Sequence, residues 1–127
     1  LAGKRLLLVE VNELNLEIAA ELLQMQGILV ETAENGQKAL EKFKASGLRE
    51  YSCILMDIQM PVMDGYQATE AIRALPRADA KEIPIIALTA NAFAADLGKA
   101  HSAGMDDHIA KPIDMQVLVE ALGRLMA

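Results

Sequence analysis

The sequence predicts a doubly wound α/β fold, in which five parallel strands form one sheet and five helices cover its two faces. Short apolar runs alternate with amphipathic stretches five times along the chain, which is typical of successive strand–helix units. The first run, Arg5–Glu10, shows no polar alternation, as expected for a strand buried on both faces. With 127 residues, of which 53% are hydrophobic, the chain suits one domain with one sizeable core.

The run at residues 5–10 is the first expected strand, and a helix is expected to follow it. Asn12 can cap the start of this helix, and Gly27 can end it. Apolar residues recur along the helix at helical spacing. They form one stripe that we expect to be buried, which consists of Leu14, Ile18, Leu22 and Met25.

A second strand is expected at residues 28–33, before the turn signal Asn35-Gly36. The helix after this turn presents an apolar face made of Ala39, Leu40 and Phe43. A third strand begins at residue 51 or 52 and ends at Asp57. A carboxylate therefore stands at the carboxyl end of a buried strand, where open α/β proteins place their chemistry.

The second half of the chain continues the alternation after a loop marked by Pro61 and Gly65. It is expected to contain a helix at 66–75, a polar connection at 76–84, a strand at 85–88, a helix at 92–102, a strand at 108–110 and a last helix capped by Asp114. The inward residues are Thr69, Ile72 and Leu75 in the first of these helices, and Val117 or Leu118, Ala121, Leu122 and Leu125 in the last.

Reactive side chains stand at or just beyond four of the strand ends. Glu10 and Asp57 end two strands, whereas Thr89 and Lys111 follow two others. Because parallel strands place all their carboxyl ends at one edge, we expect these side chains to converge. An acid, a hydroxyl and an ammonium at one edge suit the capture of a phosphoryl group.

Composition and charge exclude several classes of function. The net charge of −6 argues against a nucleic-acid surface, and no basic stripe favours a membrane. The single cysteine, Cys53, excludes an internal disulfide and fits a reducing, cytoplasmic compartment. We expect residues 1–127 to be a single domain cut from a longer multidomain protein, which can be membrane-anchored elsewhere.

Over nearly its full length the chain resembles the receiver domains of two-component response regulators. Four segments carry the resemblance: Leu7–Glu10 (LLVE), Met56–Gly65 (MDIQMPVMDG), Ala87–Ala92 (ALTANA) and Ala103–Pro112 (AGMDDHIAKP). Their amino-acid sequences are most similar to the corresponding segments of receivers in hybrid sensor histidine kinases. The resemblance implies a flavodoxin-like sheet of strand order 2-1-3-4-5, and acceptance of a phosphoryl group from a phosphohistidine.

The resemblance also implies a role for each residue at this edge of the sheet. Asp57 is the implied phosphoacceptor, whose carboxylate attacks phosphorus and forms an acyl phosphate. Lys111 would neutralise phosphoryl charge, and Thr89 would donate a hydrogen bond to a phosphoryl oxygen. Glu10, Asp57 and the backbone carbonyl of Gln59 would hold Mg²⁺, which prefers oxygen ligands and keeps several waters.

One position departs from the family pattern, which has two adjacent acids at the end of the first strand. The pair here is Glu10-Val11, and valine has no oxygen that could bind a hard cation. We therefore expect weak Mg²⁺ binding and slow Mg²⁺-dependent phosphorylation. Two alternatives remain open. One is a degenerate pseudo-receiver that binds proteins without phosphorylation; the other is a small flavodoxin-like cofactor binder, although residues 10–13 form no glycine-rich phosphate loop.

The implied output is a conformational switch. Phosphorylation would draw Thr89 inward, and His108 would turn inward with it, unless His108 is only a half-exposed side chain on an edge strand. The implied partners are a histidine kinase core and a histidine-phosphotransfer domain, which would dock on the helix face around Leu14 and Asn15. The domain would not turn over a free substrate, although its parent chain can be a hybrid histidine kinase. Its oligomeric state stays open.

Overall fold

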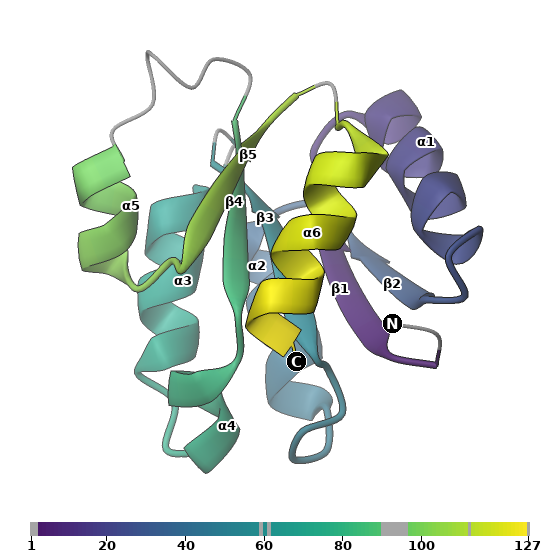
Figure 1. Cartoon of the computed structure of the whole chain (residues 1–127). Coiled ribbons are helices and arrows are strands. Elements are labelled where there is room, and N and C mark those ends of the chain that lie inside the picture. Colours follow the sequence, from purple (N-terminus) through teal and green to yellow (C-terminus); the bar gives the residue numbers. More distant parts are fainter. Residues whose placement is uncertain (1–2, 59, 61, 90–96, 112, 127) are drawn as a thin grey trace.

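Five parallel strands form one twisted sheet in the computed structural model (Figure 1). The structure describes residues 3–58, 60, 62–89, 97–111 and 113–126. The strands are β1 (Arg5–Val9), β2 (Leu29–Ala33), β3 (Cys53–Asp57), β4 (Ile85–Thr89) and β5 (Asp107–Ala110). They lie in the order β2-β1-β3-β4-β5, and every neighbouring pair is parallel. The predicted sheet and its strand order are confirmed.

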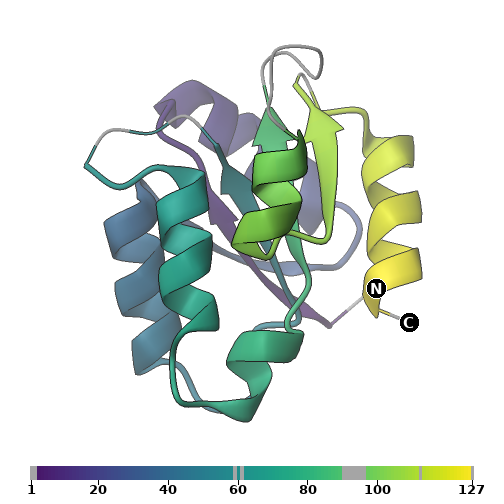
Figure 2. The same ribbon diagram turned by 90° about the vertical axis from the view of Figure 1, so that its left-hand side faces the viewer.

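Six helices among the described residues surround the sheet. They are α1 (Glu13–Gln24), α2 (Gly36–Ala45), α3 (Gly65–Arg73), α4 (Ala78–Glu82), α5 (Leu97–Ala103) and α6 (Met115–Met126). α1 and α6 cover one face of the sheet, and α2, α3 and α5 cover the other (Figures 1 and 2). The short helix α4 lies near the amino ends of the strands (Figure 1).

Each face of the sheet has its own hydrophobic core. Successive residues of a strand point to opposite faces, so Leu6 and Leu8 of β1 belong to the core beneath α1 and α6. Leu7 and Val9 belong to the core beneath α2, α3 and α5. All residues of β3 and β4 are buried, as expected for central strands covered on both sides.

The buried face of α1 is not the face expected from the sequence. Leu14, Ile18 and Met25 are 64%, 49% and 79% exposed, whereas Ala19 and Leu23 are buried. The helix carries two apolar stripes, and the small side chain of Ala19 lets α1 lie close to the sheet. The predicted stripe is therefore wrong, and Leu14, Ile18 and Met25 instead form an exposed apolar surface, which we call the outer α1 surface.

Two predicted helix caps are confirmed, and α2, α3 and α6 pack as expected. Asn12 and Asp114 each accept a hydrogen bond from a backbone N–H in the first turn of their helix, at 3.0 and 2.9 Å. Phe43, Ile72 and Leu122, which come from three of the predicted inward faces, are fully buried. Apolar periodicity was therefore sufficient for these helices, which carry one dominant stripe each.

The connection at residues 76–84 is more ordered than expected. It contains the short helix α4, which raises the number of helices from the predicted five to six. Arg77 and Asp79 form an ion pair at the start of α4, with 2.8 Å between Nη2 and Oδ2. This pair neutralises the polar segment and lets it pack against the core. Of the helix expected at residues 92–102, residues 92–96 lie outside the described residues.

Candidate functional site

Three charged side chains meet at the carboxyl edge of the sheet. The ammonium of Lys111 lies 2.6 Å from a carboxylate oxygen of Glu10 and 3.1 Å from one of Asp57. Glu10 and Asp57 are each 4% exposed, and the Lys111 side chain is 18% exposed. Parallel pairing brings them together, because β1 and β3 are neighbours and both end at this edge.

The charges of this cluster do not balance. Two carboxylates, Glu10 and Asp57, share the ammonium of Lys111, so the three groups together carry one negative charge. Burial lowers the pKa of Lys111, but its hydrogen bond to Glu10 and the charge of Asp57 outweigh burial and raise the pKa above its ordinary value. Lys111 therefore stays cationic and serves as the counterion of both acids.

Thr89 lies at the same edge, at the end of β4. Its backbone carbonyl accepts a hydrogen bond from the N–H of Lys111 at 2.7 Å, which anchors the backbone of Lys111 beyond β5. The residue is 6% exposed. The four residues expected to converge, Glu10, Asp57, Thr89 and Lys111, are thus placed at one edge, two of them on adjacent central strands.

A close backbone contact holds the start of α3 beneath Asp57. A Cβ atom on Gly65 would lie 2.3 Å from the Asp57 carbonyl oxygen, so only glycine fits at this position. Gly65 also donates its N–H to the carbonyl of Ile58 at 2.9 Å. Asp64 and Gln67 close a capping box around the first turn of α3. These contacts fix where α3 begins relative to Asp57. The turn signal at Gly65 predicted a turn here but not these contacts.

The position beside Glu10 offers nothing to a cation. Val11 is 45% exposed and has no oxygen in its side chain. One oxygen of Glu10 accepts the N–H of Asn12 at 3.1 Å, and the other is bonded to Lys111. Gln59, whose carbonyl is a predicted ligand, lies outside the described residues.

Within the described part of the chain, no group of three or more acidic, histidine or cysteine side chains could hold a metal ion. The described side chains thus fit Mg²⁺ poorly: they supply two carboxylates, and both are already bonded to Lys111.

His108 lies on the edge strand β5 and its side chain is 41% exposed. A carboxylate oxygen of Asp107 lies 3.8 Å from its Nδ1. Across the sheet it is paired with Ala87 rather than with Thr89. In this state the ring occupies a half-exposed edge position, and the predicted inward turn stays a prediction.

The sequence matches the response regulator receiver domain over residues 6–123. This chain belongs to that family. The receiver is 38% identical over 121 residues to hybrid signal transduction histidine kinase I of Dictyostelium discoideum, a match that covers 94% of this chain. It is also 38% identical over 118 residues to the peroxide stress-activated histidine kinase mak1 of Schizosaccharomyces pombe, with 92% of this chain covered. The chain spans 7% of the length of each of these two relatives.

Solved structures agree with this assignment. The receiver domain of a sensor histidine kinase from Pseudomonas aeruginosa, with a magnesium ion coordinated in its active site cleft, has a TM-score of 0.88 and 38% identity. That match covers 98% of both chains. Chemotaxis protein CheY4 of Vibrio cholerae has a TM-score of 0.87 and 27% identity, covering 98% of this receiver and 99% of CheY4. Among the described residues, no helix is both long and apolar enough to cross a membrane.

Proposed function

We propose that this receiver accepts a phosphoryl group from a phosphohistidine onto Asp57. An oxygen of the Asp57 carboxylate would bond to phosphorus while the phosphorus–nitrogen bond of phosphohistidine breaks, and the imidazole would leave with the electron pair. The observation that carries the proposal is the ammonium of Lys111, which lies 3.1 Å from Asp57 at the carboxyl edge of the sheet. A cation held there reduces the repulsion between an anionic attacker and an anionic phosphoryl group.

Thr89 and Lys111 would then hold the phosphoryl group. Lys111 is charged and already bonded to Asp57, so it needs only a small displacement to contact a phosphoryl oxygen. Thr89 ends the strand beside β3 and would supply a hydroxyl donor. Movement of Thr89 would shift the segment after β4, and His108 would follow as the second switch residue.

Mg²⁺ would assist this reaction weakly. When bound, it would neutralise phosphoryl oxygens, with Glu10, Asp57 and the carbonyl of Gln59 as its protein ligands. Weak binding is supported by Val11, which places an apolar side chain where the family has an acid, and by the use of Lys111 as the resident counterion. We also propose that the domain works in the cytoplasm, as its composition predicts.

The partners would be a histidine kinase core and a histidine-phosphotransfer domain, as in a hybrid histidine kinase of which this chain would be a segment. The outer α1 surface supports this, because Leu14 is 64% exposed and α1 begins next to Glu10. We expect Leu14→Asp to slow phosphotransfer from a histidine-phosphotransfer protein while acetyl phosphate still labels the domain. Met25→Asp, at the far end of α1, is the matched control, and equal transfer rates for the two variants would rule out this docking face.

Phosphorylation by acetyl phosphate tests the central proposal. Intact-mass spectrometry should show one added phosphoryl group on the wild-type chain and none on Asp57→Asn. Val11→Asp should tighten Mg²⁺ binding in calorimetric titration and raise the Mg²⁺-dependent rate by at least about tenfold, the effect typical of groups that support a metal site. Wild-type Mg²⁺ binding as tight as that of Val11→Asp would contradict the assigned effect of Val11.

The same experiment separates this function from the pseudo-receiver alternative. That alternative is favoured by one observation, the exposed valine beside Glu10. A pseudo-receiver would remain unlabelled with or without Mg²⁺, from acetyl phosphate and from a phosphohistidine donor alike. If only Val11→Asp is labelled, the wild-type fold is a protein-interaction module that has lost its phosphoacceptor chemistry.

A further inference from the structure

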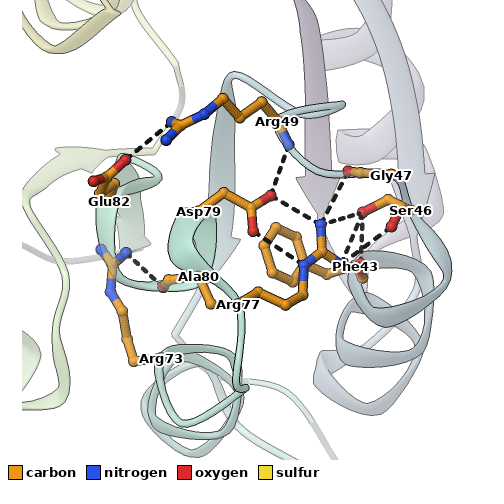
Figure 3. Close-up of polar contacts among 9 residues, drawn as sticks. All are labelled: Phe43, Ser46, Gly47, Arg49, Arg73, Arg77, Asp79, Ala80 and Glu82. Carbon is orange, nitrogen blue, oxygen red and sulfur yellow. Dashed lines mark hydrogen bonds and ion pairs between the residues drawn. The ribbon is translucent and has the colours of Figure 1, made fainter.

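Arg73 links the carboxyl ends of three helices. It is the last residue of α3, and its side chain is only 16% exposed. Its Nη1 donates hydrogen bonds to the carbonyl of Ala80 in α4 (Figure 3) and to that of Ile83 just beyond α4, at 3.1 and 2.7 Å. Its Nε and Nη2 both donate to the carbonyl of Gly104, which follows α5, at 3.0 and 2.7 Å. One guanidinium thus satisfies carbonyls at the ends of α4 and α5.

The turn that ends α5 fits closely around this arginine. Gly104 has a φ of +111°, a backbone conformation that favours glycine after a helix. A Cβ atom on Gly104 would lie 3.0 Å from Cγ and 3.1 Å from Nε of Arg73. Glycine therefore lets the side chain of Arg73 lie directly against the turn. Two donors of one rigid, planar group reach the same carbonyl, which fixes both the position and the direction of this end of α5.

Asp106 extends this contact to the sheet. Its carboxylate oxygen Oδ2 lies 3.0 Å from Nη2 of Arg73 and accepts the N–H of Ile85, the first residue of β4, at 2.9 Å. The N–H of Asp106 in turn donates to the carbonyl of Ile85 at 2.8 Å. The segment that joins α5 to β5 is therefore held by α3 and by the start of β4 at the same time.

The amino end of α5 lies nearer to the charged cluster in the chain and has a different kind of contact. α5 is the next described helix after β4, which ends at Thr89. Near this end, the ammonium of Lys99 lies 4.8 Å from the centre of the Tyr66 ring in α3. A cation is attracted to a ring over a range of positions within about 6 Å, whereas hydrogen bonds weaken steeply when their angles change. The contact at Lys99 therefore tolerates sliding, and the contact at Arg73 does not.

We propose that Arg73 is a positioning residue that makes Gly104 the pivot of α5. A movement that starts at Thr89 would reach α5 at its amino end, and the helix would swing there while its carboxyl end stays in place. The swing rests on the proposed phosphoacceptor function. The fixed carboxyl end does not, because the contacts of Arg73 are made without a phosphoryl group.

Amide hydrogen exchange of the unphosphorylated chain tests the fixed end. Arg73→Lys keeps the charge but loses the planar set of donors. The N–H groups of Gly104 and Met105 donate to carbonyls of α5 and report on its last turn. We expect both to exchange faster in the variant by on the order of tenfold, the effect of losing one hydrogen bond from a charged group. The amides of α1 should keep their wild-type rates.

Arg124→Met is the matched control for this measurement. Arg124 forms an ion pair with Asp107, the residue after Asp106, but its side chain is 65% exposed. The control should therefore leave the exchange at Gly104 unchanged. Equal acceleration in α1 and α5 of Arg73→Lys, or the same acceleration at Gly104 in the control, would overturn the pivot.

Distances between paired spin labels test the swing. Glu70→Cys in α3 carries the reference label, and Gly98→Cys or Ser102→Cys carries the second label near either end of α5. All three positions are exposed, whereas the native Cys53 is fully buried. With acetyl phosphate, we expect the distance from 70 to 98 to change and the distance from 70 to 102 to stay the same. In the background of Arg73→Lys, both distances should change.

Asp57→Asn separates the effect of phosphorylation from that of acetyl phosphate itself, and neither distance should change in this variant. Equal changes at both ends of α5 in the wild-type background, or none at either end of a phosphorylated chain, would overturn the swing. If acetyl phosphate adds no mass to the wild-type chain, the proposed function fails and the swing fails with it. The exchange at Gly104 then still decides whether Arg73 fixes the end of α5.

Discussion

The two ends of the sheet each hold a buried cluster of charges, and the two clusters match acids to cations differently. At the carboxyl edge, Glu10 and Asp57 share one cation, Lys111. At the amino ends of the strands, Arg77 and Asp79 form a pair of equal and opposite charges (Figure 3). The difference indicates that the first cluster serves ligand chemistry and the second serves the fold.

The Arg77 cluster satisfies almost every group that it contains (Figure 3). The guanidinium donates to the carbonyls of Phe43, Ser46 and Gly47 at 2.6, 3.1 and 2.9 Å, and so closes the carboxyl end of α2. It also donates to both carboxylate oxygens of Asp79, at 3.0 and 2.8 Å. Its carbon Cζ lies 4.5 Å from the centre of the Phe43 ring, within the range of a cation–π contact.

Asp79 is the acid that matches this cation. The carboxyl group is buried, and burial alone raises its pKa. Hydrogen bonds from Arg77 and from the N–H of Arg49, which lies 2.8 Å away, outweigh burial and lower the pKa below its ordinary value. At the other edge, Glu10 and Asp57 both contact the same cation, Lys111.

Removing the acid of the neutral cluster should have the largest effect. We expect Asp79→Asn to lower the free energy of unfolding by about 3 kcal/mol, because Arg77 would keep a largely buried, unpaired charge. Urea denaturation measures this change. Glu82→Gln is the control. It breaks the ion pair between Glu82 and Arg49, whose two side chains are each 62% exposed. We expect it to lower the free energy of unfolding by less than about 1 kcal/mol. If both variants lose the same free energy of unfolding, the buried Arg77–Asp79 pair stabilises the fold no more than an exposed ion pair does.

The same loss should depend on pH. Because the folded pKa of Asp79 is lowered, its stabilising effect is present above the ordinary carboxyl pKa of about 3.9. The effect is lost as the pH falls through the folded value, since the acid is then protonated in both states. The stability difference between wild type and Asp79→Asn should therefore be constant near neutral pH and shrink below about pH 4. A difference that stays constant below pH 4 would contradict the assigned ion pair.

Neutralising an acid of the charged cluster should have the opposite sign. We expect Asp57→Asn to raise the free energy of unfolding by about 1 kcal/mol, because it removes the repulsion between two carboxylates that contact the same ammonium. The same variant should lose phosphorylation, so stability and function would oppose each other at this residue. Thermal denaturation of wild type and variant without Mg²⁺ gives the comparison. A destabilised Asp57→Asn would contradict this assigned repulsion.

A third group tests whether a buried polar group without a partner is enough to indicate a functional site. The hydroxyl of Thr69 on α3 is fully buried and has no hydrogen-bond partner among the described residues. It lies in the middle of α3. We expect Thr69→Val to stabilise the fold by up to about 1 kcal/mol and to leave phosphorylation unchanged, because the unsatisfied hydroxyl is removed at constant shape. Reduced labelling by acetyl phosphate would assign Thr69 to the site after all.

The sequence predicted which charged residues meet at the carboxyl edge better than it predicted the charge clusters elsewhere in the fold. Asp57 and Lys111 could be placed together because parallel strands end at a common edge. Arg77 and Asp79 gave no such signal, since two charges in a polar connection are usually solvated. No sequence pattern predicted the role of Arg73 either. It donates a hydrogen bond to the Gly104 carbonyl at 2.7 Å and forms an ion pair with Asp106 at 3.0 Å. These partners lie about thirty residues away, so no local pattern reveals them.

By itself, the sequence determined the alternation of strands and helices, the single dominant stripes of α2, α3 and α6, and the strand ends that carry Glu10, Asp57 and Thr89, because these depend on local periodicity. Only the tertiary structure decided which apolar stripe of α1 is buried. Both stripes have helical spacing, and the choice depends on how closely Ala19 and Leu23 approach the sheet. It also decided that Lys111 contacts Glu10 as well as Asp57, since the balance of charges at an edge depends on distances between strands that no local sequence contains.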